Sequence, residues 1–172
     1  MSTVTGLFND KESAERAYQY ALDTGYSSTD IDVIMSKDTR ERHYGEHTTL
    51  ETEVGNKSAE GAAIGGAVGA TVGAIAAAVA AAGTVLVLPG LGLVVAGPLA
   101  AGIAGAGAGG VGAGLVGALI GWAIPEDTLK EYESGLKNGG IVIGVNSKSD
   151  VERQRFAKDW EANNGLHIHT NQ

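Results

Sequence analysis

A single uncharged stretch, from Gly61 to Ile124, limits what this chain can fold into. Its 64 residues include no Lys, Arg, Asp, Glu or His, and they hold 18 of the 27 glycines of the chain. Small residues recur at every fourth position in both halves of the stretch, and this spacing places them on one face of a helix. Such a pattern is typical of helices that pack closely against other helices. The two columns are Gly61, Gly65, Gly69, Gly73, Ala77 and Ala81, then Gly105, Gly109, Ala113, Gly117 and Gly121.

Helices this rich in glycine need surroundings that hold them together, because each interior glycine costs about 1 kcal/mol relative to alanine. Lipid is our first expectation, since a helix satisfies its own backbone where water is absent. The core of a protein assembly is the alternative. Pro89-Gly90 and Gly97-Pro98 interrupt the stretch and predict helices from about Ala59 to Leu88 and from about Leu99 to Ala123. Each is long enough to cross a hydrocarbon layer of about 30 Å.

The segment between these two expected helices, Thr84 to Pro98, is the most hydrophobic part of the chain. A loop that emerges into water is normally polar, so we expect this one to lie in lipid or inside an assembly. A tryptophan stands at the opposite end of the hairpin, where a membrane-interface anchor is expected. The residues expected to anchor the hairpin are Leu86, Leu88, Leu91, Leu93 and Trp122.

The charged part before the stretch predicts one β-α-β unit in residues 1–36. A strand from Thr3 to Phe8 is followed by a helix with Asn9 as its expected cap and Gly25 as its expected stop. Alternating apolar residues then predict a strand from Ile31 to Ser36. Residues 37–59 are polar and charged, which predicts a flexible linker.

The charged part after the stretch, residues 125–172, predicts a helix and a second β-α-β unit. A helix from Glu126 to Asn138 is expected to end at two glycines, and a buried strand follows from Ile141 to Val145. Ser149 is the expected cap of the next helix, which Gly165 ends. The last strand is expected from Leu166 to Thr170.

Two β-α-β units in one small chain predict an α+β fold of the ferredoxin-like, split β-α-β type. The apolar glycine-zipper hairpin, residues 60–124, would be inserted between the units. Because a hairpin returns its two ends to the same side, the two charged ends can fold together and complete one sheet.

Residues near both ends resemble a known family. The run Val4-Thr5-Gly6-Leu7-Phe8, the later run Ile31-Asp32-Val33, and Ala14, Ala17, Leu22 and Gly25 between them are similar to the start of bacterial general stress proteins of the heat-induced, 17M-like type. The run Gly139-Gly140-Ile141-Val142-Ile143 resembles a later strand of that family. The resemblance implies a stress-response role without enzymatic activity. The long glycine-rich insert departs from the shortest members, which are small soluble proteins.

Composition narrows the function further. The net charge of −8 argues against nucleic-acid binding, and the absence of cysteine excludes a disulfide scaffold. The first residues carry no secretory signal pattern, so the central stretch is the expected membrane segment. Histidine pairs occur at His43 and His47 and at His167 and His169, and we expect solvated surface positions rather than metal ligands. No catalytic, cofactor-binding or metal-binding residues are expected.

Three functions remain open. The first is a non-enzymatic stress-response protein at the bacterial inner membrane, with its charged domain facing the cytoplasm, that forms homo-oligomers through its glycine columns. The second is a soluble, self-assembling cytoplasmic protein that buries the hairpin in an oligomer core. The third is a small-ligand or enzymatic role of the ferredoxin-like domain. The expected oligomerisation residues are Gly61, Gly65, Gly69, Gly73, Gly105, Gly109, Gly117 and Gly121.

Overall fold

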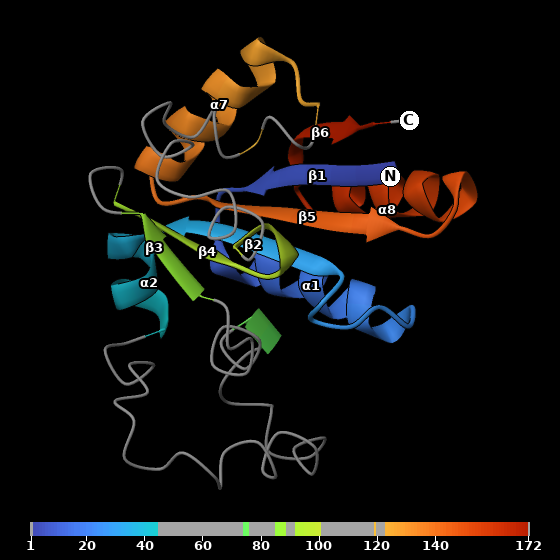
Figure 1. Ribbon diagram of the computed structural model, residues 1–172, viewed down its shortest axis with the longest axis horizontal. Helices are drawn as coiled ribbons and strands as arrows, with labels where there is room; N and C mark the ends of the chain where they lie inside the picture. Colours follow the sequence, from blue (N-terminus) through green and yellow to red (C-terminus); the bar gives the residue numbers. More distant parts are fainter. Residues whose placement is uncertain are drawn as a thin grey trace, which may run out of the picture.

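The computed structural model describes residues 2–44, 74–75, 85–88, 92–100, 119 and 123–171. Over these ranges the chain forms a six-stranded sheet in the order β3-β4-β2-β5-β1-β6 (Figure 1). Each pair of neighbouring strands is antiparallel. The α+β class that the sequence predicts is therefore confirmed.

The first 36 residues form the expected strand-helix-strand unit, which consists of β1 (Ser2–Phe8), α1 (Lys11–Asp23) and β2 (Ile31–Ser36). The cap of α1 is Asp10 rather than Asn9, because the Asp10 carboxylate accepts a hydrogen bond from the Ser13 N–H at 2.7 Å. The expected stop is correct. Gly25 follows the C-cap and adopts a φ of 88°, which side-chain-bearing residues rarely adopt.

A helix, α2 (Lys37–Tyr44), replaces the first part of the expected polar linker. The Ser36 hydroxyl accepts a hydrogen bond from the Thr39 N–H at 3.0 Å, and Lys37 pairs with Glu41 at 3.6 Å one turn along the helix. Local capping and pairing thus form a helix where no apolar periodicity predicts one. The remainder of the expected linker lies outside the described residues.

The greatest departure from the sequence expectation lies in the middle of the uncharged stretch. Residues expected at the end of a helix form β3 (Val85–Leu88), and residues expected in a turn form β4 (Leu93–Ala96). β4 pairs with β2, so this pair of strands extends the sheet. The run Val-Leu-Val-Leu before Pro89-Gly90 has the length and the branched residues of a strand. The prediction of a helical hairpin with an apolar loop at its tip is therefore wrong for these residues.

The last part of the chain forms α7 (Glu126–Lys137), β5 (Ile141–Ser147), α8 (Asp150–Ala162) and β6 (Leu166–Thr170). Ser149 caps α8 as expected, and its hydroxyl accepts a hydrogen bond from the Glu152 N–H at 3.3 Å. The end of α8 differs from the expectation, because Asn164 rather than Gly165 takes the left-handed conformation, with a φ of 63°. Asparagine is the residue that most readily replaces glycine there.

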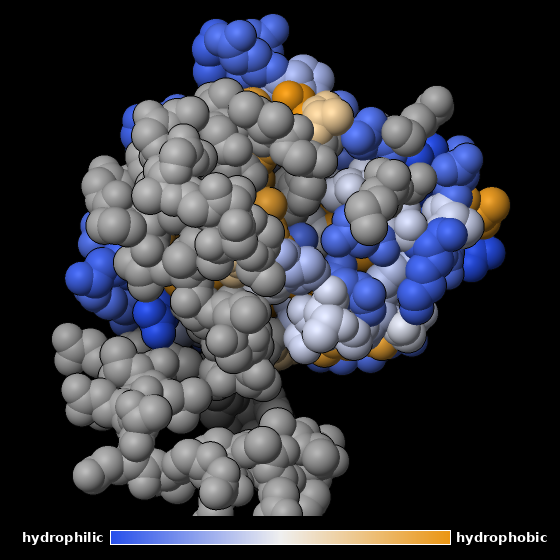
Figure 2. All heavy atoms as spheres, viewed as in Figure 1, coloured by the Kyte–Doolittle hydropathy of each residue, from blue (hydrophilic) through white to orange (hydrophobic). Residues whose placement is uncertain are grey.

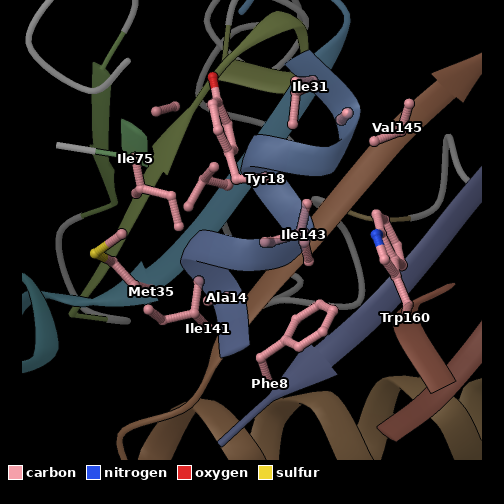
Figure 3. Packing of buried hydrophobic residues seen from close by; sticks show 14 of the residues in the cluster. Phe8, Ala14, Tyr18, Ile31, Met35, Ile75, Ile141, Ile143, Val145 and Trp160 are labelled. Atoms are coloured by element: carbon pink, nitrogen blue, oxygen red, sulfur yellow. The ribbon is translucent and has the colours of Figure 1, made fainter. Parts of the chain in front are cut away.

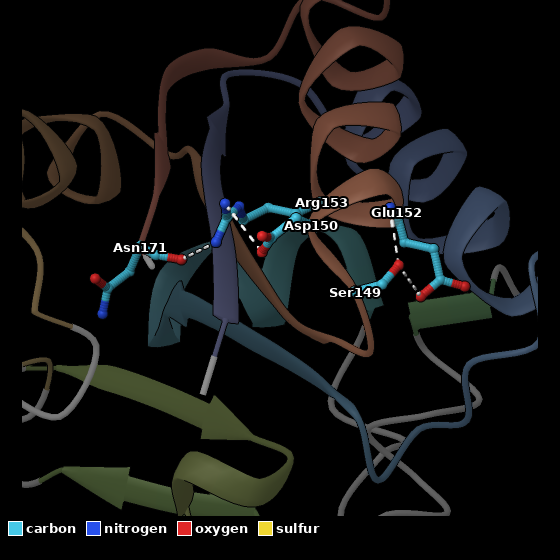
Figure 4. Close-up of polar contacts among 5 residues, drawn as sticks. All are labelled: Ser149, Asp150, Glu152, Arg153 and Asn171. Carbon is cyan, nitrogen blue, oxygen red and sulfur yellow. Dashed lines mark hydrogen bonds and ion pairs between the residues drawn. The ribbon is translucent and has the colours of Figure 1, made fainter.

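The two charged ends of the chain fold together, as the sequence predicts. β1 lies between β5 and β6, and the Asn171 N–H donates to the Thr3 carbonyl at 2.9 Å. Arg153 of α8, a residue that is only 6% exposed, also connects the two ends of the chain. It donates to the Asn171 carbonyl at 2.6 Å and pairs with Asp150 at 3.2 Å (Figure 4).

Hydrophobic residues fill both faces of the sheet. The first core lies on the face covered by α1 and α8, and the second core lies on the face covered by α7. The largest buried side chains of the first core include Phe8, Tyr18, Ile31, Met35, Ile75, Ile141, Phe156 and Trp160 (Figure 3). The second core contains Leu7, Ile34, Leu93, Val95, Ala100, Leu119, Ile124, Leu129, Tyr132, Leu136 and Val142.

The described surface is mainly hydrophilic on the face that Figure 2 displays, and hydrophobic colour is confined to small areas. Among the described residues, the large hydrophobic side chains that are exposed are Val151 and Leu166. Isolated exposed residues of this kind are normal for a soluble surface.

Candidate functional site

Two acidic side chains of the α+β domain bind backbone N–H groups of the uncharged stretch. Asp32 of β2 accepts a hydrogen bond from the Leu99 N–H at 2.6 Å, and Glu15 of α1 accepts one from the Ile75 N–H at 3.0 Å. We call the Glu15–Ile75 contact the first attachment and the Asp32–Leu99 contact the second attachment. Together they form the candidate functional site, because they connect the folded domain to the segment that has the most unusual composition.

The second attachment begins where β4 ends. Gly97 leaves the strand with a φ of 110°, and Pro98 then starts a helical turn in which the Ala100 N–H donates to the Gly97 carbonyl at 3.1 Å. Proline suits the first position of a helix because its missing N–H would have no partner there. The next N–H belongs to Leu99, and it donates the hydrogen bond that the Asp32 carboxylate accepts. Asp32 therefore caps this turn from a neighbouring strand.

The backbone at position 97 approaches β2 so closely that only glycine fits there. A Cβ atom built at Gly97 would lie 2.7 Å from the Asp32 Oδ1 atom and would also collide with the Ile31 carbonyl oxygen. Gly97 therefore brings the chain close enough for the Asp32 carboxylate to reach the Leu99 N–H.

The Asp32 carboxylate is almost completely buried, at 1% exposure. Burial raises its pKa from 3.8 to about 7, and the hydrogen bond from Leu99 opposes that rise. Desolvation dominates because one neutral N–H donor replaces only part of the hydration of a charged carboxylate. Asp32 therefore changes its protonation near neutral pH, which an exposed aspartate does not do.

The first attachment lies on the opposite face of the sheet. The Ile75 side chain is fully buried in the first core, beside Tyr18 and Met35 (Figure 3). Glu15 raises the pKa of Tyr44 as well, after the larger effect of burial. Leu99, Ala100 and Leu119 all pack in the second core instead. The uncharged stretch therefore contacts both faces of the domain.

The sequence-predicted site residues are only partly within the described ranges. Leu93 is 7% exposed and belongs to the second core, so it packs inside the domain instead of at an exposed tip. Leu86 and Leu88 belong to β3. The remaining expected residues lie outside the described residues, and these are Gly61, Gly65, Gly69, Gly73, Leu91, Gly105, Gly109, Gly117, Gly121 and Trp122.

Sequence reasoning missed Asp32 and Glu15. A charged residue inside the apolar run Ile31-Asp32-Val33-Ile34-Met35 was the available signal for the first of them. A buried charge needs a partner, so the run could have indicated a capping or ligand role. The sequence signal for Glu15 was weaker, because Glu15 borders the apolar face of α1 as many solvated residues do.

The histidine pairs gain no metal-binding arrangement. Over the part of the chain that the structure describes, no three His, Cys, Asp or Glu residues are grouped to hold a metal ion. His167 adopts a φ of 49° where the pairing of β6 with β1 shifts register. His47 lies outside the described residues.

A small pocket of about 280 Å³ lies between α1 and α8. Its polar groups mostly bind one another, because the Tyr26 hydroxyl donates to Glu152 at 2.9 Å and accepts from the Lys148 N–H at 2.9 Å. These bonds join the end of α1 to the start of α8. The polar residues at the pocket therefore help to hold the two helices together.

None of the helices in the described ranges is both long enough and apolar enough to cross a membrane. Comparison of the chain with protein-family models, with curated proteins and with solved structures gave no match in any of the three.

Proposed function

We propose that the protein is a non-enzymatic, self-associating protein in which an α+β domain holds a glycine-rich segment whose columns pair with those of other copies. The domain itself is proposed to be a ferredoxin-like unit. The strand order β2-β5-β1-β6 and the connections through α1 and α8 support this, because they form two β-α-β units in one antiparallel sheet. The resemblance of Val4–Phe8 to general stress proteins is the reason for proposing a stress-response role.

One observation carries the proposal: the residues of the stretch that are buried in the domain are not members of the glycine columns. Ile75 and Leu119 are both fully buried in the domain. Ile75 is two residues from Gly73, and Leu119 is two residues from both Gly117 and Gly121. Two residues correspond to about 200° around a helix, so a helical column points away from the attached face. The columns are then available to pack against another helix.

The attachments also favour pairing between copies over pairing within one chain. Ile75 packs in the first core and Leu119 packs in the second core, on opposite faces of the sheet. A single hairpin in which the two columns face each other would need its helices side by side. At these two residues the domain lies between them.

Membrane association is the second form of the proposal, with the charged domain in the cytoplasm and the columns paired within the inner membrane. The uncharged length of residues 61–124 supports it. The burial of Leu93 in the second core removes one of the side chains that were expected to anchor a tip in lipid. For this reason self-association without lipid is the first form of our proposal, and membrane association is the second.

A pair of substitutions tests the role of the columns. Gly109→Leu adds a large side chain to a column, and Gly107→Leu adds the same side chain about 200° away on the same helix. Overpacking costs about 1–3 kcal/mol per site, so Gly109→Leu should lower the average oligomer mass while Gly107→Leu leaves it close to the wild-type value. Sedimentation equilibrium, with and without a mild detergent, provides the measurement. Equal masses for the two variants would remove the columns from the account.

The same preparations separate the two forms of the proposal. A protein-only assembly should keep its mass when detergent is added, and it should remain at the bottom of a flotation gradient with vesicles of phosphatidylethanolamine and phosphatidylglycerol. A membrane-associated protein should float with the vesicles. Flotation of the wild type would reverse the order in which we place the two forms.

A further inference from the structure

We propose that Asp32 is a proton-controlled latch, which in its protonated form holds the segment beginning at Pro98 against the sheet and which weakens that attachment when it loses the proton. The inference concerns the regulation of the second attachment. Only its consequence for assembly depends on the proposed function.

The geometry gives Asp32 this position. Its carboxyl group reaches across from β2 to the first helical N–H after β4, that of Leu99, at 2.6 Å. Gly97 covers the carboxyl so closely that a methyl group there would collide with it. Ala100, one residue beyond Leu99, is buried in the second core. Opening this turn would therefore uncover both the carboxyl group and the first docked residue of the segment.

Among the described residues, the groups that shift the pKa of Asp32 include no cation that would neutralise a negative charge. Gly144 of β5 lies opposite it in the sheet and has no side chain, and residues 98–100 are uncharged. Asp30, two residues away on the same chain, is itself a carboxylate. From α1, Tyr18 is a buried titratable group whose pKa is raised by burial and, to a smaller extent, by Glu15 and Asp32, so the phenol remains neutral. The Tyr132 hydroxyl of α7 bonds to Thr5 of β1 and to the His167 carbonyl of β6, and burial raises its pKa as well, so it is also neutral.

Protonation therefore favours the closed state. The carbonyl oxygen of a neutral carboxyl group still accepts the Leu99 N–H, so the proton removes the cost of a buried charge and keeps the bond. In an open turn Asp32 is hydrated, and its pKa returns toward the ordinary value of 3.8, compared with about 7 when the turn is closed. Between those values the open state loses its proton first. Opening should thus become about tenfold more favourable for each pH unit of increase, and it should level off above pH 7.

Acidification is then the signal that tightens the second attachment. Because pH 7 is the midpoint of the closed-state titration, a fall from pH 7 to pH 6 should strengthen closure about fivefold. If the glycine columns pair between copies, the latch would control how firmly each copy holds the helix that carries the second column. Failure of column pairing would leave the latch itself untouched, because its closure is a property of one chain.

Hydrogen exchange at the Leu99 amide tests the latch in the full chain. Exchange is measured at pH 5, 6, 7 and 8 and expressed as a protection factor, which divides out the intrinsic effect of pH on exchange. We expect protection in the wild type to fall about tenfold per unit from pH 5 to pH 7 and to change little from pH 7 to pH 8. Asp32→Asn, which is neutral at all of these values, should abolish the dependence.

A matched control is Asp30→Asn, because Asp30 is a more exposed carboxylate in the turn just before β2, and hydrogen bonds from Ser27 lower its pKa. This variant should retain the wild-type profile. A flat wild-type profile would overturn the latch, and this result does not depend on whether any variant folds. The same slope in Asp32→Asn as in the wild type would overturn it as well. The sedimentation mass of the column variants is a separate readout, so failure of the proposed function can be recognised independently.

Discussion

At the scale of single residues, Asp32 is predicted to make the stability of the domain depend on pH. Its carboxyl group has a pKa of about 7 when buried in the folded chain and 3.8 as the ordinary value. The folded state therefore holds a proton that the unfolded state releases between those pH values. The contribution of Asp32 to stability is fully present below about pH 4 and is lost as the pH rises through 7, by about 1.4 kcal/mol per unit.

The prediction is that Asp32→Asn removes this pH dependence. Relative to the wild type, the variant should gain free energy of unfolding as the pH rises from 5 to 8, by roughly 2–3 kcal/mol as an order of magnitude. Urea unfolding followed by the fluorescence of buried Trp160 measures the difference at the two pH values. An identical loss of stability in both proteins would contradict the assignment of the effect to Asp32.

Gly97 makes a second prediction at this scale. Gly97→Ala adds a methyl group against Asp32 and Ile31, and it also strains the backbone at a φ of 110°. Gly92→Ala is the matched control, because Gly92 also has a positive φ, of 61°, but has open space where its Cβ would lie. Both should lower the melting temperature, since non-glycine residues at positive φ cost about 1–2 kcal/mol. Only the first should lose more than that, and equal losses would show that the contact with Asp32 contributes nothing.

At the scale of elements, the sequence predicts those parts in which local pattern and burial agree. β1, α1, β2, α7, β5, α8 and β6 all have a clear local signal, which is either apolar residues at helical spacing or a short apolar run next to glycine or capping residues, so their existence follows from short-range rules. β3 and β4 do not, because a run of four apolar residues fits a buried helix as well as a strand. Only pairing with β2 decides between them, and such a long-range contact cannot be seen in a local pattern.

The candidate site was hidden from the sequence for a similar reason. Asp32 stands out as a charge within a strand, but its burial depends on Gly97, which is distant in the chain and follows a strand that the sequence did not predict. Glu15 depends likewise on Ile75. The columns of glycine, by contrast, are visible directly because their spacing is local.

The strand pair β3-β4 has its own prediction. Leu93 is buried in the second core, so Leu93→Ser should destabilise the domain by about 2–5 kcal/mol, as large-to-small core substitutions do. Leu166→Ser, at a residue that is 40% exposed, is the control and should have a small effect. Denaturant midpoints of the two variants provide the comparison. A domain that stays as stable as the control would mean that β4 does not belong to the sheet core and that an anchoring role for Leu93 has to be reconsidered.

At the scale of the whole molecule, we propose that the domain fixes the glycine-rich stretch in place. β4 fixes the middle of the stretch in the sheet, and the two attachments fix Ile75 and Leu99 on opposite faces. The backbone N–H groups of Ile75 and Leu99 donate the hydrogen bonds of these attachments. In our proposal the glycine columns provide the surface for self-association.

Disulfide formation between copies tests this central claim most directly. The chain contains no cysteine, so single cysteines introduce no competing pairs. Position 113 belongs to the second column, and position 111 would lie about 200° away from it on the helix that we propose, so the two variants are Ala113→Cys and Val111→Cys. The account predicts that mild oxidation joins two copies through Ala113→Cys much faster than through Val111→Cys, as measured by non-reducing electrophoresis over time. Equal rates at the two positions, or no covalent dimer at either one, would contradict self-association through the glycine columns.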